Sequence, residues 1–313
     1  MREMKFGIAI GLVAVTLYSQ PLVTTVAGAG GLGAANHQLH YPGGIAFDGN
    51  DNLYIADSYN HRILKMKPSG EITILLGTGA PGIGANQLNY PRTLALDGAG
   101  NIYITDSYNH RIQKLSTNGT VTTIAGGNGM GSELNQLAYP RGIAVDSAGN
   151  VFVSDNYNHR VLRVAPGGAI TVAAGGRGQG NGANELNYPF GLAVDSAGAL
   201  YIGDAYNQRV QKILPDGTAT TVAGSGGAGL GPNQLVNPVG VDVDKAGNLY
   251  VSDTNNNRIQ MISPSGVVTT IAGGRGEGKG ELELSSPFDT AVDSQGNLFV
   301  SDTFNHRIQG MIF

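Results

Sequence analysis

The residues most able to do chemistry in this chain recur at one fixed spacing. The triplet Asn60-His61-Arg62 returns every 49 residues through six copies, with Gln208 and Asn257 replacing histidine in the fourth and fifth. Histidine is a common metal ligand and proton carrier, so the column first suggests a metal or acid–base site. Ligands of one ion must converge, however, and residues that occur once per repeat need not. The sequence therefore predicts a structural role here, with no catalytic residue and no metal ligand.

Each arginine of the triplet follows an aspartate by five positions. A guanidinium and a carboxylate at the two ends of a short hairpin can form a charge-assisted pair that also binds the hairpin backbone. We therefore predict a partly buried structural pair in every repeat. The predicted pairs are Asp57–Arg62, Asp106–Arg111, Asp155–Arg160, Asp204–Arg209, Asp253–Arg258 and Asp302–Arg307.

Function specific to this chain is expected where the repeats disagree, because shared residues build the scaffold. The departures follow a proline that opens each repeat and comprise two cations, two aromatic rings and two carboxylates. They are Arg92, Arg141, Phe190, Phe288, Asp242 and Asp289. This set predicts a site for a small ligand or a peptide. The alternative is neutral drift in which the charges compensate one another.

Four short strands in each repeat must position these residues. In the second repeat, residues 93–97 form an apolar run, 102–106 and 111–115 alternate as strands do, and 120–125 is rich in β-branched residues. A period of 49 residues is the span of one four-stranded blade. The sequence therefore predicts an all-β, six-bladed β-propeller with antiparallel four-stranded blades.

The two ends of the chain predict how the ring closes. The last repeat stops after its third strand, whereas residues 22–27 (LVTTVA) match the column of the fourth strand. An N-terminal strand that joins the C-terminal blade would remove the open seam. Six-fold placement then sets Arg141 opposite Asp289 across the upper mouth of the central channel, and Arg92 opposite the unit that carries Asp242.

Tyrosine also recurs, both before the proline and beside the asparagine of the triplet. We expect these rings to pack, because tyrosine combines a large apolar body with a hydroxyl that can stay wet. The alternative is a binding face, since both connections lie on one end of a propeller. The tyrosines are Tyr41, Tyr59, Tyr90, Tyr108, Tyr139, Tyr157, Tyr188 and Tyr206.

The repeated pattern D-x-x-N-H-R-[IV], with N-[LIV]-[YF] before it and Y-P-x-G farther upstream, resembles the NHL-repeat family over residues 22–313. The Gly-rich segments that end in Q-L-x-Y-P are similar to those of bacterial secreted and cell-surface members. The resemblance implies a six-bladed propeller that acts as an interaction module or a sensor. Some members are similar to a peptide-amidating lyase with a central zinc held by histidines of separate blades. This chain departs from that pattern, because its unrepeated histidines, His37 and His40, lie in one loop.

Composition limits the location and the partners. Arg2 and Lys5 precede an apolar run over 6–18, which predicts a signal peptide over 1–20, or an uncleaved anchor, ahead of a propeller over 21–313. A secreted, periplasmic or cell-surface protein without a membrane span in its mature form is therefore expected. The net charge of −4 and the lack of a basic cluster argue against nucleic acid, and the absence of cysteine excludes disulfides.

Two functions remain open. The first is an extracytoplasmic, monomeric binding scaffold that holds a protein, peptide or small-molecule ligand on its loop-rich face, with no cofactor. The second is a metal-dependent lyase or lactonase-like hydrolase with calcium or zinc in the channel, for which Asp242 and Asp289 give slight support.

Overall fold

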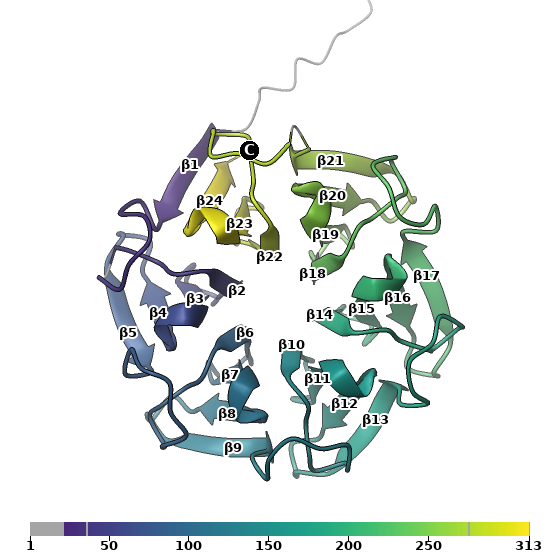
Figure 1. The fold of residues 1–313 in the computed structure, drawn as a ribbon, viewed down its shortest axis with the longest axis horizontal. Coiled ribbons are helices and arrows are strands. Elements are labelled where there is room, and N and C mark those ends of the chain that lie inside the picture. The colour runs from purple at the N-terminus through teal and green to yellow at the C-terminus, as the bar shows by residue number, and fades with distance from the viewer. Residues whose placement is uncertain (1–21, 36, 275, 313) are drawn as a thin grey trace, which may run out of the picture.

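Six four-stranded sheets surround a central axis in the computed structural model, as Figure 1 shows. The structure describes residues 22–35, 37–274 and 276–312, so the predicted signal or anchor segment over 1–20 lies outside it. Within the described residues the helical structure consists of six three-residue 3-10 turns. None of the helical segments in this part of the chain is long and apolar enough to cross a membrane. The predicted all-β, six-bladed propeller is confirmed.

Each blade runs outward from the axis through antiparallel strands, with a 3-10 turn between its second and third strands (Figure 1). Blade one contains β2 (Pro42–Phe47), β3 (Leu53–Asp57), η1 (Ser58–Asn60), β4 (Arg62–Met66) and β5 (Ile72–Leu76). Blade two contains β6 (Pro91–Leu96), β7 (Ile102–Asp106), η2 (Ser107–Asn109), β8 (Arg111–Leu115) and β9 (Val121–Gly126). Blade three contains β10 (Pro140–Val145), β11 (Val151–Asp155), η3 (Asn156–Asn158), β12 (Arg160–Val164) and β13 (Ile170–Gly175).

The other three blades repeat this order. Blade four contains β14 (Pro189–Val194), β15 (Leu200–Asp204), η4 (Ala205–Asn207), β16 (Arg209–Ile213) and β17 (Ala219–Ala223). Blade five contains β18 (Pro238–Val243), β19 (Leu249–Asp253), η5 (Thr254–Asn256), β20 (Arg258–Ile262) and β21 (Val268–Gly273). Blade six contains β22 (Pro287–Val292), β23 (Leu298–Asp302), η6 (Thr303–Asn305), β24 (Arg307–Ile312) and, from the other end of the chain, β1 (Leu22–Ala27).

The hydrophobic core lies between blades rather than within one sheet. All five residues of β7 are buried, as expected for a strand covered on both faces. Ile104 and Leu94 of blade two share one apolar cluster with Ile63 of blade one. The same arrangement recurs around the ring, so each blade is stabilised by its neighbours.

The innermost strand begins earlier than predicted. Residues 93–97 were expected to form it in the second repeat, but β6 starts at Pro91, which pairs with Asp106, and ends at Leu96. The register shifts between Pro91 and Leu94, and the equivalent irregularity recurs in every blade. Such bulges redirect side chains near functional sites. Here the irregularity falls on Arg92 and its counterparts.

The ring closes through its first described strand. β1 pairs antiparallel with β24, with Val23 opposite Met311 and Thr25 opposite Gln309. The predicted N-terminal strand is therefore confirmed, and the two ends of the described chain complete one blade (Figure 1).

Candidate binding face at the channel mouth

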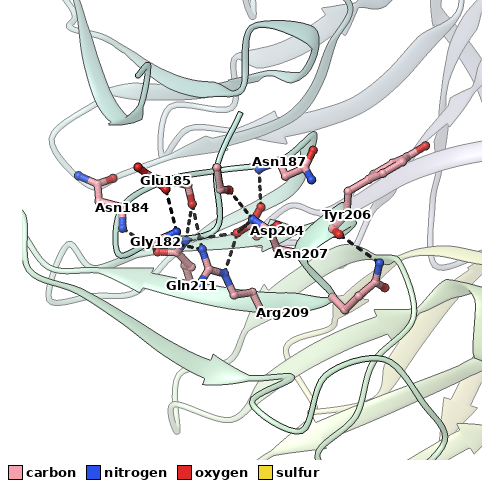
Figure 2. Close-up of polar contacts among 11 residues, drawn as sticks. Gly182, Asn184, Glu185, Asn187, Asp204, Tyr206, Asn207, Arg209 and Gln211 are labelled. Atoms are coloured by element: carbon pink, nitrogen blue, oxygen red, sulfur yellow. Dashed lines mark hydrogen bonds and ion pairs between the residues drawn. The ribbon is translucent and has the colours of Figure 1, made fainter. Parts of the chain in front are cut away.

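The aspartate–arginine pairs hold the loops of this face in place. In blade four, shown in Figure 2, Asp204 Oδ2 accepts hydrogen bonds from Arg209 Nε and Asn207 Nδ2, each at 2.8 Å. Arg209 Nη2 also donates to the carbonyl oxygens of Gly182 and Glu185, at 2.9 and 3.0 Å. The aspartate is fully buried in all six blades. These side chains hydrogen-bond one another and the loop that leads into their own blade, which is a structural role.

The histidine column links neighbouring blades. His61 Nδ1 accepts a hydrogen bond from the backbone N–H of Tyr90 in the next blade, at 3.1 Å. Gln208 Oε1 and Asn257 Oδ1 do the same for the N–H groups of Asn237 and Ser286, at 2.6 and 2.8 Å. The column therefore requires a hydrogen-bond acceptor.

The histidines of this column are held neutral by their surroundings. Burial lowers the pKa of His61, His110, His159 and His306, which keeps Nδ1 free to accept a hydrogen bond at neutral pH. Among the described residues, no group of three or more His, Asp or Glu side chains is placed to hold a metal ion. The histidines lie one per blade and do not converge.

A continuous chain of tyrosine rings covers this face. Consecutive rings in the series lie 4.5 to 5.3 Å apart between centroids and cross the blades from one to four. We call the series the tyrosine arc, which consists of Tyr41, Tyr59, Tyr90, Tyr108, Tyr139, Tyr157, Tyr188 and Tyr206. At blade five and at the start of blade six the equivalent positions carry Asn237, Asn255 and Ser286, which interrupt it. The arc is thus open on one side.

Two arginines lie close together inside the tyrosine arc. The Arg141 guanidinium sits over the ring of Phe190, 5.1 Å from its centroid, and Arg92 interacts with the Tyr108 side chain. The Nε atoms of both arginines are shielded from solvent and lack a hydrogen-bond partner. Among the described carboxylates, none lies within ion-pair distance of either arginine.

The electrostatics of this arginine pair are unfavourable without a counter-charge. Burial lowers the pKa of Arg92, and burial together with the positive charge of Arg92 lowers the pKa of Arg141 to about 10. Desolvation and like-charge repulsion both disfavour the charged forms. A bound anion would offset both the desolvation of the two guanidinium groups and the repulsion between them.

Two carboxylates face the central channel below the mouth. Asp242 and Asp289 are half-buried and line a cavity of about 290 Å³. Burial raises the pKa of Asp242 to about 7 and that of Asp289 to about 8, and the charge of Asp242 adds to the rise at Asp289. Asp289 Oδ2 accepts a hydrogen bond from the N–H of Ile45 at 3.1 Å, which joins blade six to blade one.

The structure brings most of the divergent residues of the repeats to one place. Arg141, Phe190, Phe288 and Asp289 line a mouth cavity of about 10 Å³. Asp242 is not part of that lining and lies in the wider channel with Asp289. Arg92 stands beside Arg141 within the arc.

Two features of this face were not found from the sequence. One is the acceptor role of the histidine column, although the replacement of histidine by Gln208 and Asn257 signals it, because all three side chains offer an acceptor. The other is the continuity of the tyrosine arc, which depends on how neighbouring blades meet. Nothing in a single repeat indicates that contact.

Comparisons with known proteins agree with the repeats and the fold. A family model described as the NHL repeat matches residues 39–66, 88–115, 137–164, 186–213, 235–261 and 284–311. No curated protein matches the chain in sequence.

Solved structures resemble the chain in fold. A streptogramin B lyase superposes with a TM-score of 0.61 at 16% identity, covering 92% of this chain and 96% of the other. A gluconolactonase from Xanthomonas campestris superposes with a TM-score of 0.67 at 15% identity, covering 93% of this chain and 89% of the other. A Bacteroides thetaiotaomicron protein of unknown function superposes with a TM-score of 0.71 at 18% identity, covering 93% of this chain and 75% of the other. At these identities the likeness concerns the fold alone.

Proposed function

Because the chain belongs to the NHL-repeat family, with six copies that build one closed propeller, we propose that it is a monomeric extracytoplasmic binding scaffold. Its ligand would lie on the face formed by the tyrosine arc and the channel mouth. The family match and the propeller support the scaffold, whereas the ligand and the location belong to the proposal.

One observation carries the proposal: Arg92 and Arg141 approach each other without a carboxylate partner. Buried cations in proteins are normally paired, because removing a charge from water is costly. Elsewhere in the chain the buried arginines follow this rule, as Arg160 does with Asp155 at 2.7 Å. Unpaired charge that is kept in a folded protein is a mark of a functional site.

The location rests on the first residues of the sequence. An apolar run over 6–18 follows Arg2 and Lys5, which is the order of a secretory signal. Cell fractionation of the tagged full chain tests this part, with recovery outside the cytoplasm expected. Recovery in the cytoplasm alone would reject the extracytoplasmic part of the proposal.

A binding screen tests the scaffold function. The full propeller is applied to immobilised glycans and peptides, in parallel with an Arg92→Gln/Arg141→Gln variant. We expect at least one class of ligand to bind the parent and to be lost in this variant. Arg177→Gln is the single-site control, because Arg177 is exposed on the loop after β13 and loses one positive charge through the same substitution. Binding that survives the double substitution would place the site elsewhere.

A metal-dependent lyase or lactonase-like hydrolase is the second candidate. It is favoured by Asp242 and Asp289, whose raised pKa values near 7 and 8 suit proton transfer at neutral pH. Metal analysis of the purified protein separates the two functions. Stoichiometric calcium or zinc that disappears in an Asp242→Asn/Asp289→Asn variant would favour the enzyme.

A further inference from the structure

We infer that the ligand of this face is an acidic oligosaccharide, whose anionic group binds between Arg92 and Arg141 while its sugar rings lie on the tyrosine arc. The inference rests on the proposed function and deepens it, because it names the chemical class of the ligand. Carboxylate and sulfate are the two sources of the anionic group.

The first step is the charge. Arg92 and Arg141 come from the innermost strands of adjacent blades, β6 and β10, and repel each other. Both are half-buried, so part of each side chain remains accessible although the Nε atoms are not. An oxyanion with two or three oxygens can accept from two guanidinium groups at once, and it removes their repulsion.

The second step is the surface around the arginines. Tyr59, Tyr108, Tyr157 and Tyr206 are 38%, 43%, 49% and 59% exposed, so their rings offer broad, flat and accessible surface. A sugar ring presents C–H bonds of slight positive charge on its faces, which suit the negative face of an aromatic ring. Its hydroxyls can hydrogen-bond the tyrosine hydroxyls at the same time.

The third step is the shape of the mouth. Its cavity of about 10 Å³ among Arg141, Phe190 and Phe288 is too small for an amino-acid side chain. Peptide ligands are commonly recognised through pockets for their side chains, and this mouth cavity is too small to serve as one. A sugar chain needs a platform rather than a pocket, so the mouth favours a carbohydrate.

The fourth step is the interruption at blade five. Asn237, Asn255 and Ser286 occupy the positions that carry aromatic rings in other blades, and Asn255 is exposed. These short polar side chains leave a lower, hydrogen-bonding edge on one side of the arc. An oligosaccharide whose anionic group is bound by the two arginines can extend beyond the binding face across this edge.

Calorimetry with defined oligosaccharides tests the inference. We expect a galacturonic acid trimer or a sulfated trisaccharide to bind the full propeller, and the neutral trimer of matched linkage to bind at least tenfold more weakly. Arg92→Gln/Arg141→Gln should weaken the acidic ligand at least tenfold, whereas Arg177→Gln should not. Comparing the two acids shows whether carboxylate or sulfate is preferred.

A second readout needs no variant. The chain has 13 tyrosines and no tryptophan, so its intrinsic emission comes from tyrosine, and eight of these residues form the arc. Binding of the acidic trimer should change this emission in the parent protein. Equal binding of the neutral trimer, or acid binding without a change in emission, would overturn the inference.

The failure of this inference can be told apart from that of the proposed function. If an acidic peptide binds through the two arginines and the acidic sugars do not, the ligand class is wrong and the scaffold function stands. If no ligand in the screen depends on Arg92 and Arg141, both proposals fall.

Discussion

At the residue scale, the six repeats use the same charges in two opposite ways. Arg160 is enclosed and fully partnered, by Asp155 and by the carbonyl oxygens of Ser132, Glu133 and Gln136. Arg141 is half-buried and stands next to a second cation. One arginine therefore stabilises the fold, and the other is expected to cost stability until a ligand binds.

Arg160→Ala should lower the free energy of unfolding by about 3–5 kcal/mol, because it leaves the buried carboxylate of Asp155 unpaired. Chemical denaturation measures the loss. Arg177→Ala, at an exposed loop position, serves as the control and should change little. A variant that unfolds at the same denaturant concentration as the parent would contradict the structural role.

Arg141→Gln should behave differently in the ligand-free protein. It removes one of two repelling guanidinium groups, so the free energy of unfolding should stay equal to that of the parent or rise by up to about 2 kcal/mol. The same denaturation experiment measures it. A clear loss of stability would show that Arg141 has a structural partner after all.

The pKa of Asp289 predicts how stability depends on pH. Its value is raised to about 8 in the folded protein from an ordinary value of 3.8, so the folded state holds this proton more tightly than the unfolded chain. The stability from this group is present below pH 4 and is lost as the pH rises towards 8. Asp289→Asn, which mimics the protonated acid, should flatten the fall in Tm between pH 4 and 8. An unchanged slope would show that the carboxyl ionises normally.

At the element scale, the strands that were predicted best are those with clear boundaries on both sides. The ranges 102–106 and 111–115 match β7 and β8, because alternation and the Asp106–Arg111 pair mark their ends. The start of β6 was missed because Pro91 joins the sheet across an irregularity, and no side chain signals such a break. The fourth strand, β9, begins and ends one residue later than expected.

The closing strand offers a test at this scale. A chain that begins at Gly28 lacks β1 and leaves β24 without its outer partner, so its Tm should fall by several degrees, at about 2–4 °C per kcal/mol lost. A circular permutant that carries LVTTVA after Ile312 through a short linker should restore it. Equal melting of the truncated chain and the parent would show that β1 adds nothing.

At the scale of the whole molecule, a nearly six-fold scaffold carries an asymmetric face. The divergent residues were found from the sequence, and the opposite charges were expected to face each other across the axis. The ring order of the blades sets β10 opposite β22 and β6 opposite β18, as expected. It also places Arg92 beside Arg141 on blades two and three, and Asp242 near Asp289 on blades five and six. A repeat pattern assigns each residue to its blade. It does not show which side chains lie next to one another at the mouth of the central channel.

The open side of the tyrosine arc provides a prediction at the same scale. Asn255→Trp should strengthen the binding of a galacturonic acid hexamer about tenfold and leave that of the trimer unchanged, because only the longer chain reaches blade five, where the new ring extends the aromatic surface. Calorimetry with both lengths measures the difference. Asn118→Trp, on the exposed turn before β9 of blade two, is the control. Equal affinities for both lengths would mean that the ligand leaves by another route.

The pairing of β1 with β24 also sets the order of events during synthesis. Leu22–Ala27 leaves the ribosome first among the described strands, and its partner Arg307–Ile312 leaves last. At about 5–20 residues per second, the delay is roughly 15–60 s. For that time an apolar, β-branched segment waits without its partner. A neighbouring chain that is still folding has the same unpaired edge at β24. Refolding at high protein concentration should therefore give domain-swapped dimers in which β1 of each copy pairs with β24 of the other.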